Sequence, residues 1–152
     1  MSAVPAGPFK RPESVLVVIH TAAHECLVLE RVTPPGFWQS VTGTLRWGET
    51  HAECAGREVR EETGLDPHML RDAAIERTFP IFPALRSRYA PDVTTNLEHL
   101  WYLELPRIVP VQINPAEHRA YEWLDLDAAI AKVSSWTNRE ALERLRAERV
   151  LA

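Results

Sequence analysis

Two absences limit what kind of protein this chain can be. The 152 residues contain only two cysteines, Cys26 and Cys54, and their number and spacing fit neither a disulfide framework nor a paired zinc-ligand motif. Residues 1–13 hold no apolar stretch resembling the core of a signal peptide, and no later segment approaches membrane-spanning length. We therefore expect a cytoplasmic protein that makes no contact with membranes.

Long blocks of like charge are also missing. The chain carries 17 basic and 21 acidic residues, which give a formal net charge of −4. An overall negative field does not attract nucleic acid, whereas a small polyanion can still bind where local cations outweigh that field. The charge therefore favours a small anionic ligand over a polymer. With 45% hydrophobic residues, the chain fits a single globular domain over residues 1–152.

Hydrophobic patterns predict a mixture of strands and helices. The run from Ser14 to His20 is mostly β-branched and apolar, which is typical of a strand covered on both faces. Further strands are predicted over residues 26–31, 37–42, 75–82, 98–104 and 119–124. A long polar loop is expected over 83–97, and helices are predicted from residue 50, over 125–133 and at the C-terminus. This order indicates an α/β domain with a mixed sheet between helices.

Local signals predict where two of the helices begin. Thr50-His51-Ala52-Glu53 has the form of a capping box, and Gly64 can end that helix in a left-handed conformation. Thr137-Asn138-Arg139-Glu140 predicts a second capping box at the start of the terminal helix. Gly56, inside the first helix, costs roughly 1 kcal/mol relative to alanine. We therefore expect close packing around Gly56.

The most informative segment joins the predicted strand at residues 37–42 to the first predicted helix. It reads Gly43-Thr-Leu-Arg-Trp-Gly-Glu49, then seven residues, then Arg57-Glu-Val-Arg-Glu-Glu-Thr-Gly-Leu65. Gly43 is expected to permit a backbone turn whose carbonyl faces a metal ion. Glu49 lies where the loop passes into the helix.

Three carboxylates in this segment share one face of the predicted helix. Glu58, Glu61 and Glu62 stand at positions i, i+3 and i+4, so their side chains project close together. Their mutual repulsion is relieved if they share divalent cations, and Mg²⁺ prefers a few carboxylates together with waters and phosphate oxygens. The segment therefore predicts an incomplete metal site that a polyphosphate can complete. A solvated helix with surface ion pairs is the alternative for an arbitrary acidic helix.

The whole segment resembles the Nudix box, Gly-x₅-Glu-x₇-Arg-Glu-U-x-Glu-Glu-x-Gly-U, where U is a bulky apolar residue. Every fixed position matches. The resemblance implies the Nudix fold, an α/β/α sandwich in which a mixed sheet lies between helices. It also implies Mg²⁺-dependent cleavage of a phosphoanhydride bond, with Mn²⁺ as a substitute ion. Arg57, by the same resemblance, orients the carboxylates of the box.

Five stretches outside the box resemble the bacterial dihydroneopterin triphosphate diphosphatases of folate synthesis. They cover residues 10–12, 37–43, 85–91, 117–124 and 135–139. The resemblance implies metal ligation by Glu58, Glu62 and Glu117, with Glu61 nearby as ligand or base. It implies further contacts to a small polyphosphate substrate, a pterin or nucleoside triphosphate, from Lys10, Arg31, Thr42, Phe79, Phe82 and Ser135.

The chemistry of these residue types agrees with such roles, but each has a simpler reading. Lys10 and Arg31 offer cations to a triphosphate, and Phe79 or Phe82 offers a ring that stacks on a flat heterocycle. Judged singly, the two phenylalanines are more typical of core residues, and Glu117 is typical of a surface carboxylate. Two rival functions stay open: a general nucleoside triphosphate or dinucleoside polyphosphate hydrolase, and a catalytically silent nucleotide-binding module.

Overall fold

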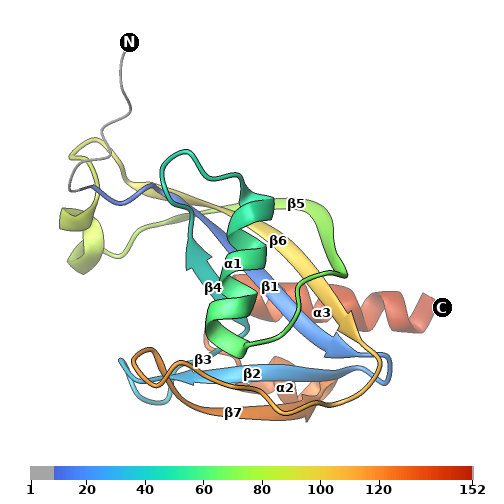
Figure 1. The fold of residues 1–152 in the computed structure, drawn as a ribbon. Helices are drawn as coiled ribbons and strands as arrows, with labels where there is room; N and C mark the ends of the chain where they lie inside the picture. Colours follow the sequence, from blue (N-terminus) through green and yellow to red (C-terminus); the bar gives the residue numbers. More distant parts are fainter. Residues whose placement is uncertain (1–8, 152) are drawn as a thin grey trace.

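Strands and helices follow one another along residues 9–151, which a computed structural model describes (Figure 1). The strands are β1 (Glu13–Thr21), β2 (Glu25–Arg31), β3 (Trp38–Gln39), β4 (Val41–Thr44), β5 (Leu70–Pro80), β6 (Thr95–Leu105) and β7 (His118–Asp125). The helices are α1 (His51–Thr63), the 3₁₀ helix η1 (Pro83–Arg88), α2 (Leu126–Lys132) and α3 (Trp136–Leu151). No helix in this part of the chain is long and apolar enough to cross a bilayer.

Strand β1 is the centre of a mixed, seven-stranded sheet. It runs parallel to β6 along its whole length, whereas its first half pairs antiparallel with β4. Its far end pairs antiparallel with β2 through His20 and Cys26. Strands β3 and β7 both pair with β2, and β5 pairs with β6. Because β4 pairs with the first half of β1 and β2 pairs with its far end, the two strands diverge and the sheet opens between them beside α1.

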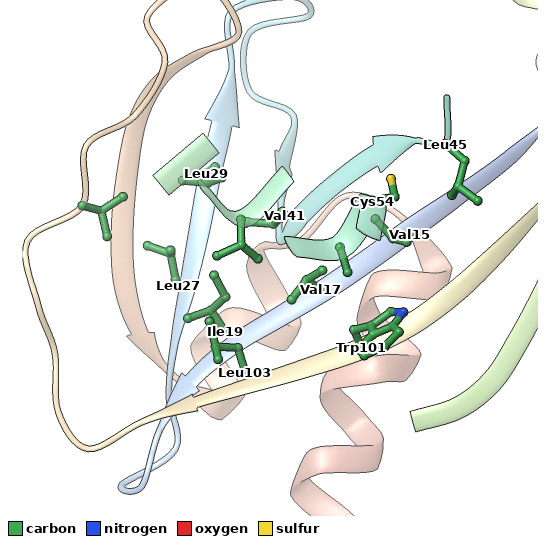
Figure 2. Close-up of a cluster of buried hydrophobic side chains, with 13 residues drawn as sticks. Val15, Val17, Ile19, Leu27, Leu29, Val41, Leu45, Cys54, Trp101 and Leu103 are labelled. Atoms are coloured by element: carbon green, nitrogen blue, oxygen red, sulfur yellow. The ribbon is translucent and has the colours of Figure 1, made fainter. Parts of the chain in front are cut away.

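Both faces of β1 are covered, as its continuous apolar run predicts. Val15, Val17 and Ile19 belong to a core formed with α1 on one face (Figure 2). Leu16 and Val18 belong to a second core formed with α2 and α3 on the other face. The alternation follows from the two-residue period of a strand. The predicted mixed sheet between helices is therefore confirmed, with α1 alone on one side (Figure 1).

Helix α1 begins and ends as its sequence predicts. The Thr50 hydroxyl accepts a hydrogen bond from the Glu53 backbone, and the Glu53 carboxylate accepts one from the Thr50 backbone at 2.9 Å. Gly64 ends the helix with φ 72° and donates its N–H to the Arg60 carbonyl. These caps give hydrogen-bond partners to backbone groups that have none within the helix. Both ends of α1 are therefore fixed, and so is the position of its carboxylates over the sheet.

Three sequence predictions about the elements are wrong. The terminal helix begins at Trp136, because the Ser135 hydroxyl accepts from the Asn138 N–H at 3.2 Å; Thr137 is not its cap. Strand β5 begins at Leu70 rather than Ile75, since a register shift near Ala74, at φ 56°, interrupts its pattern. The predicted loop over 83–97 contains η1 and the first residues of β6.

The fourth error concerns Gly56, which is not closely packed. A Cβ built on it would meet Arg60 and Pro67 side-chain atoms at 3.8 Å, which is ordinary van der Waals contact. The glycine therefore costs helix stability without serving a close approach.

Replacing Gly56 by alanine is expected to stabilise the protein by about 0.5–1 kcal/mol. Thermal unfolding should show Tm higher by about 1–4 °C for a chain of this size. Gly64→Ala is the matched contrast, because its φ of 72° disfavours any residue with a Cβ by about 1–2 kcal/mol. A lower Tm in Gly56→Ala would mean that the helix is packed more tightly there than the structure shows.

Candidate functional site

The site begins where two glutamates of α1 are pressed against β4. Glu58 and Glu62 stand one turn apart and are buried, with 8% and 3% of their surface exposed. Gly43 of β4 makes this approach possible, because a Cβ on it would lie 1.9 Å from Glu58 Oε2. Gly43 lies inside the strand and is not among the residues of positive φ. Its role is therefore close approach, and the turn predicted at this position is wrong.

Arg57 holds the carboxylates of the box in place. Its Nε and Nη2 bind the two oxygens of Glu49 at 2.7 and 2.9 Å, a bidentate fork. Its Nη1 donates to Glu58 Oε1 at 2.5 Å, and Nη2 also donates to the Thr44 carbonyl at 3.1 Å. The guanidinium lowers the pKa of Glu49 to about 2. The arginine thus contacts Glu58 and joins α1 to β4, and the orienting role that the resemblance implies stays a prediction.

The surroundings of Glu58 and Glu62 do not neutralise the ionised forms of these two buried carboxyls. Burial raises the pKa of both carboxyls, that of Glu62 to about 10, where the neighbouring Glu58 adds to the rise. Glu62 Oε1 is buried without any hydrogen-bond partner among the described residues. An orphaned carboxylate oxygen in the interior is costly unless a cation or donor meets it. The pair therefore needs a positive partner.

A cavity of about 490 Å³ opens beside this pair. Glu58, Glu62 and Glu117 line it together with Lys10 and Arg31. Burial, with Arg88 and Arg31 nearby, lowers the pKa of Lys10, so several cations converge on this side of the molecule. A lining that holds both carboxylates and cations suits a ligand that is a polyanion bound through a metal ion.

The structure brings together most of the predicted site residues. The cavity is lined by Lys10, Arg31, Thr42, Glu58, Glu62 and Glu117. The Thr42 hydroxyl is already engaged, since it donates to the Val15 carbonyl at 2.9 Å.

Other predicted residues lie outside the cavity lining. Glu61 sits next to the buried pair, but its side chain is 47% exposed and pairs with Arg57 at 3.3 Å and Arg46 at 3.6 Å. Phe79 is half-buried on β5, Phe82 is 73% exposed, and Ser135 caps α3. Contact of Phe79, Phe82 and Ser135 with a substrate stays a prediction.

Sequence reasoning missed buried polar residues of the cavity wall. Ser14, Gln39 and His118 line it and are almost fully buried. The Gln39 amide and His118 Nε2 lie 3.2 Å apart, and burial lowers the pKa of His118 to about 4. Gln39 and His118 fall inside stretches used for the family resemblance, but their pairing joins β3 to β7 and has no local signal.

The residues present fit a hard divalent cation. Among residues 9–151, no three His, Cys, Asp or Glu side chains are gathered tightly enough to form a ready-made metal cluster. The buried Glu58 and Glu62 nevertheless offer oxygens only, and Glu117 lines the same cavity. Mg²⁺ takes one or two carboxylates and completes its shell with water and phosphate. The site therefore suits an ion that arrives with a phosphate ligand better than a closed structural metal.

Comparison with known proteins places the chain among phosphate-handling enzymes. A NUDIX domain model matches residues 10–145. The dihydroneopterin triphosphate diphosphatase of Escherichia coli (strain K12) is 47% identical over 141 residues, covering 90% of this chain and 93% of that protein. The Haemophilus influenzae protein of the same name is 37% identical, covering 90% and 88%. The solved E. coli dihydroneopterin triphosphate pyrophosphohydrolase is 45% identical with a TM-score of 0.82, covering 90% and 95%.

Glu62→Gln separates two effects of the buried pair: the loss of folding stability that it causes without metal and the Mg²⁺ binding that it provides. In EDTA at neutral pH, the variant is expected to be more stable than the wild type by about 1–3 kcal/mol, because the raised pKa of Glu62 means that folding must take this carboxyl out of its ionised state, a cost that glutamine avoids. Mg²⁺ at about 100 times its Kd should stabilise the wild type by about 2.7 kcal/mol and the variant far less. Thermal unfolding with and without Mg²⁺ measures both effects.

Glu143→Gln, at an exposed position of α3, is the matched control and should follow the wild type in both conditions. An equal Mg²⁺ shift in Glu62→Gln and the wild type would mean that the ion binds elsewhere.

Proposed function

The chain belongs to the Nudix family, and we propose that it hydrolyses 7,8-dihydroneopterin 3′-triphosphate to the monophosphate and pyrophosphate with Mg²⁺. The buried Glu58–Glu62 pair beside a cation-lined cavity is the observation that carries this proposal. Two relatives named for this activity, at 47% and 37% identity over nine-tenths of the chain, support the choice of substrate.

The cavity lining contains two kinds of charged group, which suit the two parts of the proposed complex. Glu58, Glu62 and Glu117 provide oxygen ligands for the metal. Lys10 and Arg31, on the same cavity, hold phosphate oxygens and stabilise the charge that develops on the leaving group. A volume of about 490 Å³ is within the range of pockets that hold small molecules of drug size. The cavity therefore fits one small polyphosphate.

The proposed reaction is attack of water on a phosphorus of the triphosphate chain. When bound, Mg²⁺ neutralises phosphate charge and lowers the pKa of water. Arg57 acts as a positioning residue, since its fork onto Glu49 fixes the guanidinium and its Nη1 donates to Glu58. A carboxylate beside the pair, Glu61 or Glu117, accepts the proton of the attacking water. Glu61 is exposed and near the pair, and Glu117 lies on the cavity itself.

Turnover on a substrate panel tests this function. Pyrophosphate release should require Mg²⁺, and kcat/KM for 7,8-dihydroneopterin triphosphate should exceed that for dATP or a diadenosine polyphosphate by about tenfold or more. A site that pairs with polar groups of one ring rejects other rings more strongly than an apolar slot does. Some turnover of dATP is expected, since both substrates present a triphosphate.

Two results would contradict the proposal. Preference for dATP or the diadenosine polyphosphate would indicate a general nucleotide hydrolase. Absence of pyrophosphate release from every compound, with Mg²⁺ or Mn²⁺ present, would indicate a binding module without catalysis.

A further inference from the structure

A buried carboxylate on β6 has no role in the metal site. Glu98 is only 7% exposed, and burial raises its pKa to about 7. The Thr137 hydroxyl, at the start of α3, hydrogen-bonds with it and opposes that rise, as does the charge of Arg77. A carboxylate can accept about four hydrogen bonds, so Glu98 can take further donors besides the Thr137 hydroxyl.

Arg77 does not neutralise Glu98 through a direct ion pair. Its Nε donates to Glu140 Oε1 at 2.6 Å, and its Nη2 donates to the same oxygen. The arginine therefore links β5 to α3, and Glu98 stays without a cation of its own among the described residues. If Glu98 served only the fold, the protein would be more stable with glutamine or an apolar residue at this position.

The sheet register places Glu98 beside the cavity. Glu98 is the direct partner of Ser14 on β1, and Ser14 lines the cavity. Adjacent strands lie about 4.8 Å apart, and partners in register project from the same face. Asn96, two residues along β6, donates its amide to the Ser14 hydroxyl at 2.8 Å. The cavity wall at Ser14 is therefore continuous with a polar strip formed by Ser14, Asn96 and Glu98.

The same strip borders two residues predicted to contact substrate but absent from the cavity lining. Phe79 on β5 is the direct partner of Asn96, so its ring projects from the same face of the sheet. Ser135 lies just before the first turn of α3, the turn that brings Thr137 to Glu98. An aromatic side chain, an amide, a hydroxyl and a carboxylate thus surround one area beside the triphosphate cavity. This combination suits a flat polar ring.

We propose that Glu98 is a specificity-determining residue that receives the paired N–H donors of a 2-amino-4-oxopyrimidine ring, extending from the cavity past Ser14. The inference rests on the proposed function and deepens it. The ring nitrogen and the exocyclic amine of such a ring present two adjacent N–H groups, which match the two oxygens of one carboxylate. Adenine presents one donor beside an acceptor at the corresponding edge, so it cannot make both bonds.

Glu98→Gln tests the inference on the intact protein. Glutamine keeps the size of the side chain but replaces one acceptor by a donor that opposes the donors of the ring. The ratio of kcat/KM for 7,8-dihydroneopterin triphosphate to kcat/KM for dATP is expected to fall by about 10- to 100-fold. The same ratio for dGTP to dATP should fall too, because guanine carries the same donor pair. Each ratio is measured on one preparation, so any loss of folded protein cancels.

Glu104→Gln, at an exposed position of the same strand, is the matched control and should leave both ratios unchanged. A fall of either ratio in Glu98→Gln by tenfold or more supports the inference, whereas retention of both ratios within about twofold overturns it.

The two proposals fail in different ways. If the wild type does not prefer the pterin triphosphate to dATP, the proposed substrate is wrong. The effect of Glu98→Gln on the dGTP-to-dATP ratio then still decides whether Glu98 binds the two N–H donors of the ring. If the wild type prefers the pterin triphosphate and Glu98→Gln keeps that preference, the proposed function stands and the role of Glu98 is wrong.

Discussion

The cost of ionising two adjacent buried carboxyls is the constraint on which the site depends. Glu58 and Glu62 lie one turn apart in the interior, and one oxygen of Glu62 has no partner among the described residues. Nothing in the packing of a small α/β domain requires such a pair, since glutamine or an apolar side chain would be cheaper to bury. Its cost is offset when a divalent cation shared with a phosphate ligand occupies the cavity.

The surrounding fold serves to hold that pair in position. Gly43 leaves the space that Glu58 Oε2 fills, and the Arg57–Glu49 fork connects α1 to the loop before it. The caps at Thr50 and Gly64 fix both ends of α1. The core beneath α1, shown in Figure 2, packs the helix on β1, and Glu58 lies against Gly43 of β4. Local sequence, packing and electrostatics therefore agree at this one helix.

That agreement explains how much could be predicted from the sequence. The capping box, the end of α1 and the positions of Glu58 and Glu62 follow from residues close together in the chain, and the mixed sheet follows from hydrophobic periods. The start of β5 was missed because a register shift hides the pattern. The Gln39–His118 pair and the place of Glu98 beside Ser14 depend on register between distant strands, which no local signal encodes.

The position of a bound cation tests this account most directly. Crystals grown with Mn²⁺ and a slowly hydrolysed triphosphate analogue would locate the ion by its anomalous scattering. The account predicts an ion within about 2 Å of carboxylate oxygens of both Glu58 and Glu62, with the phosphate chain directed toward Lys10 and Arg31. An ion bound elsewhere, with Glu58 and Glu62 still in contact only with each other and with Arg57, would contradict it.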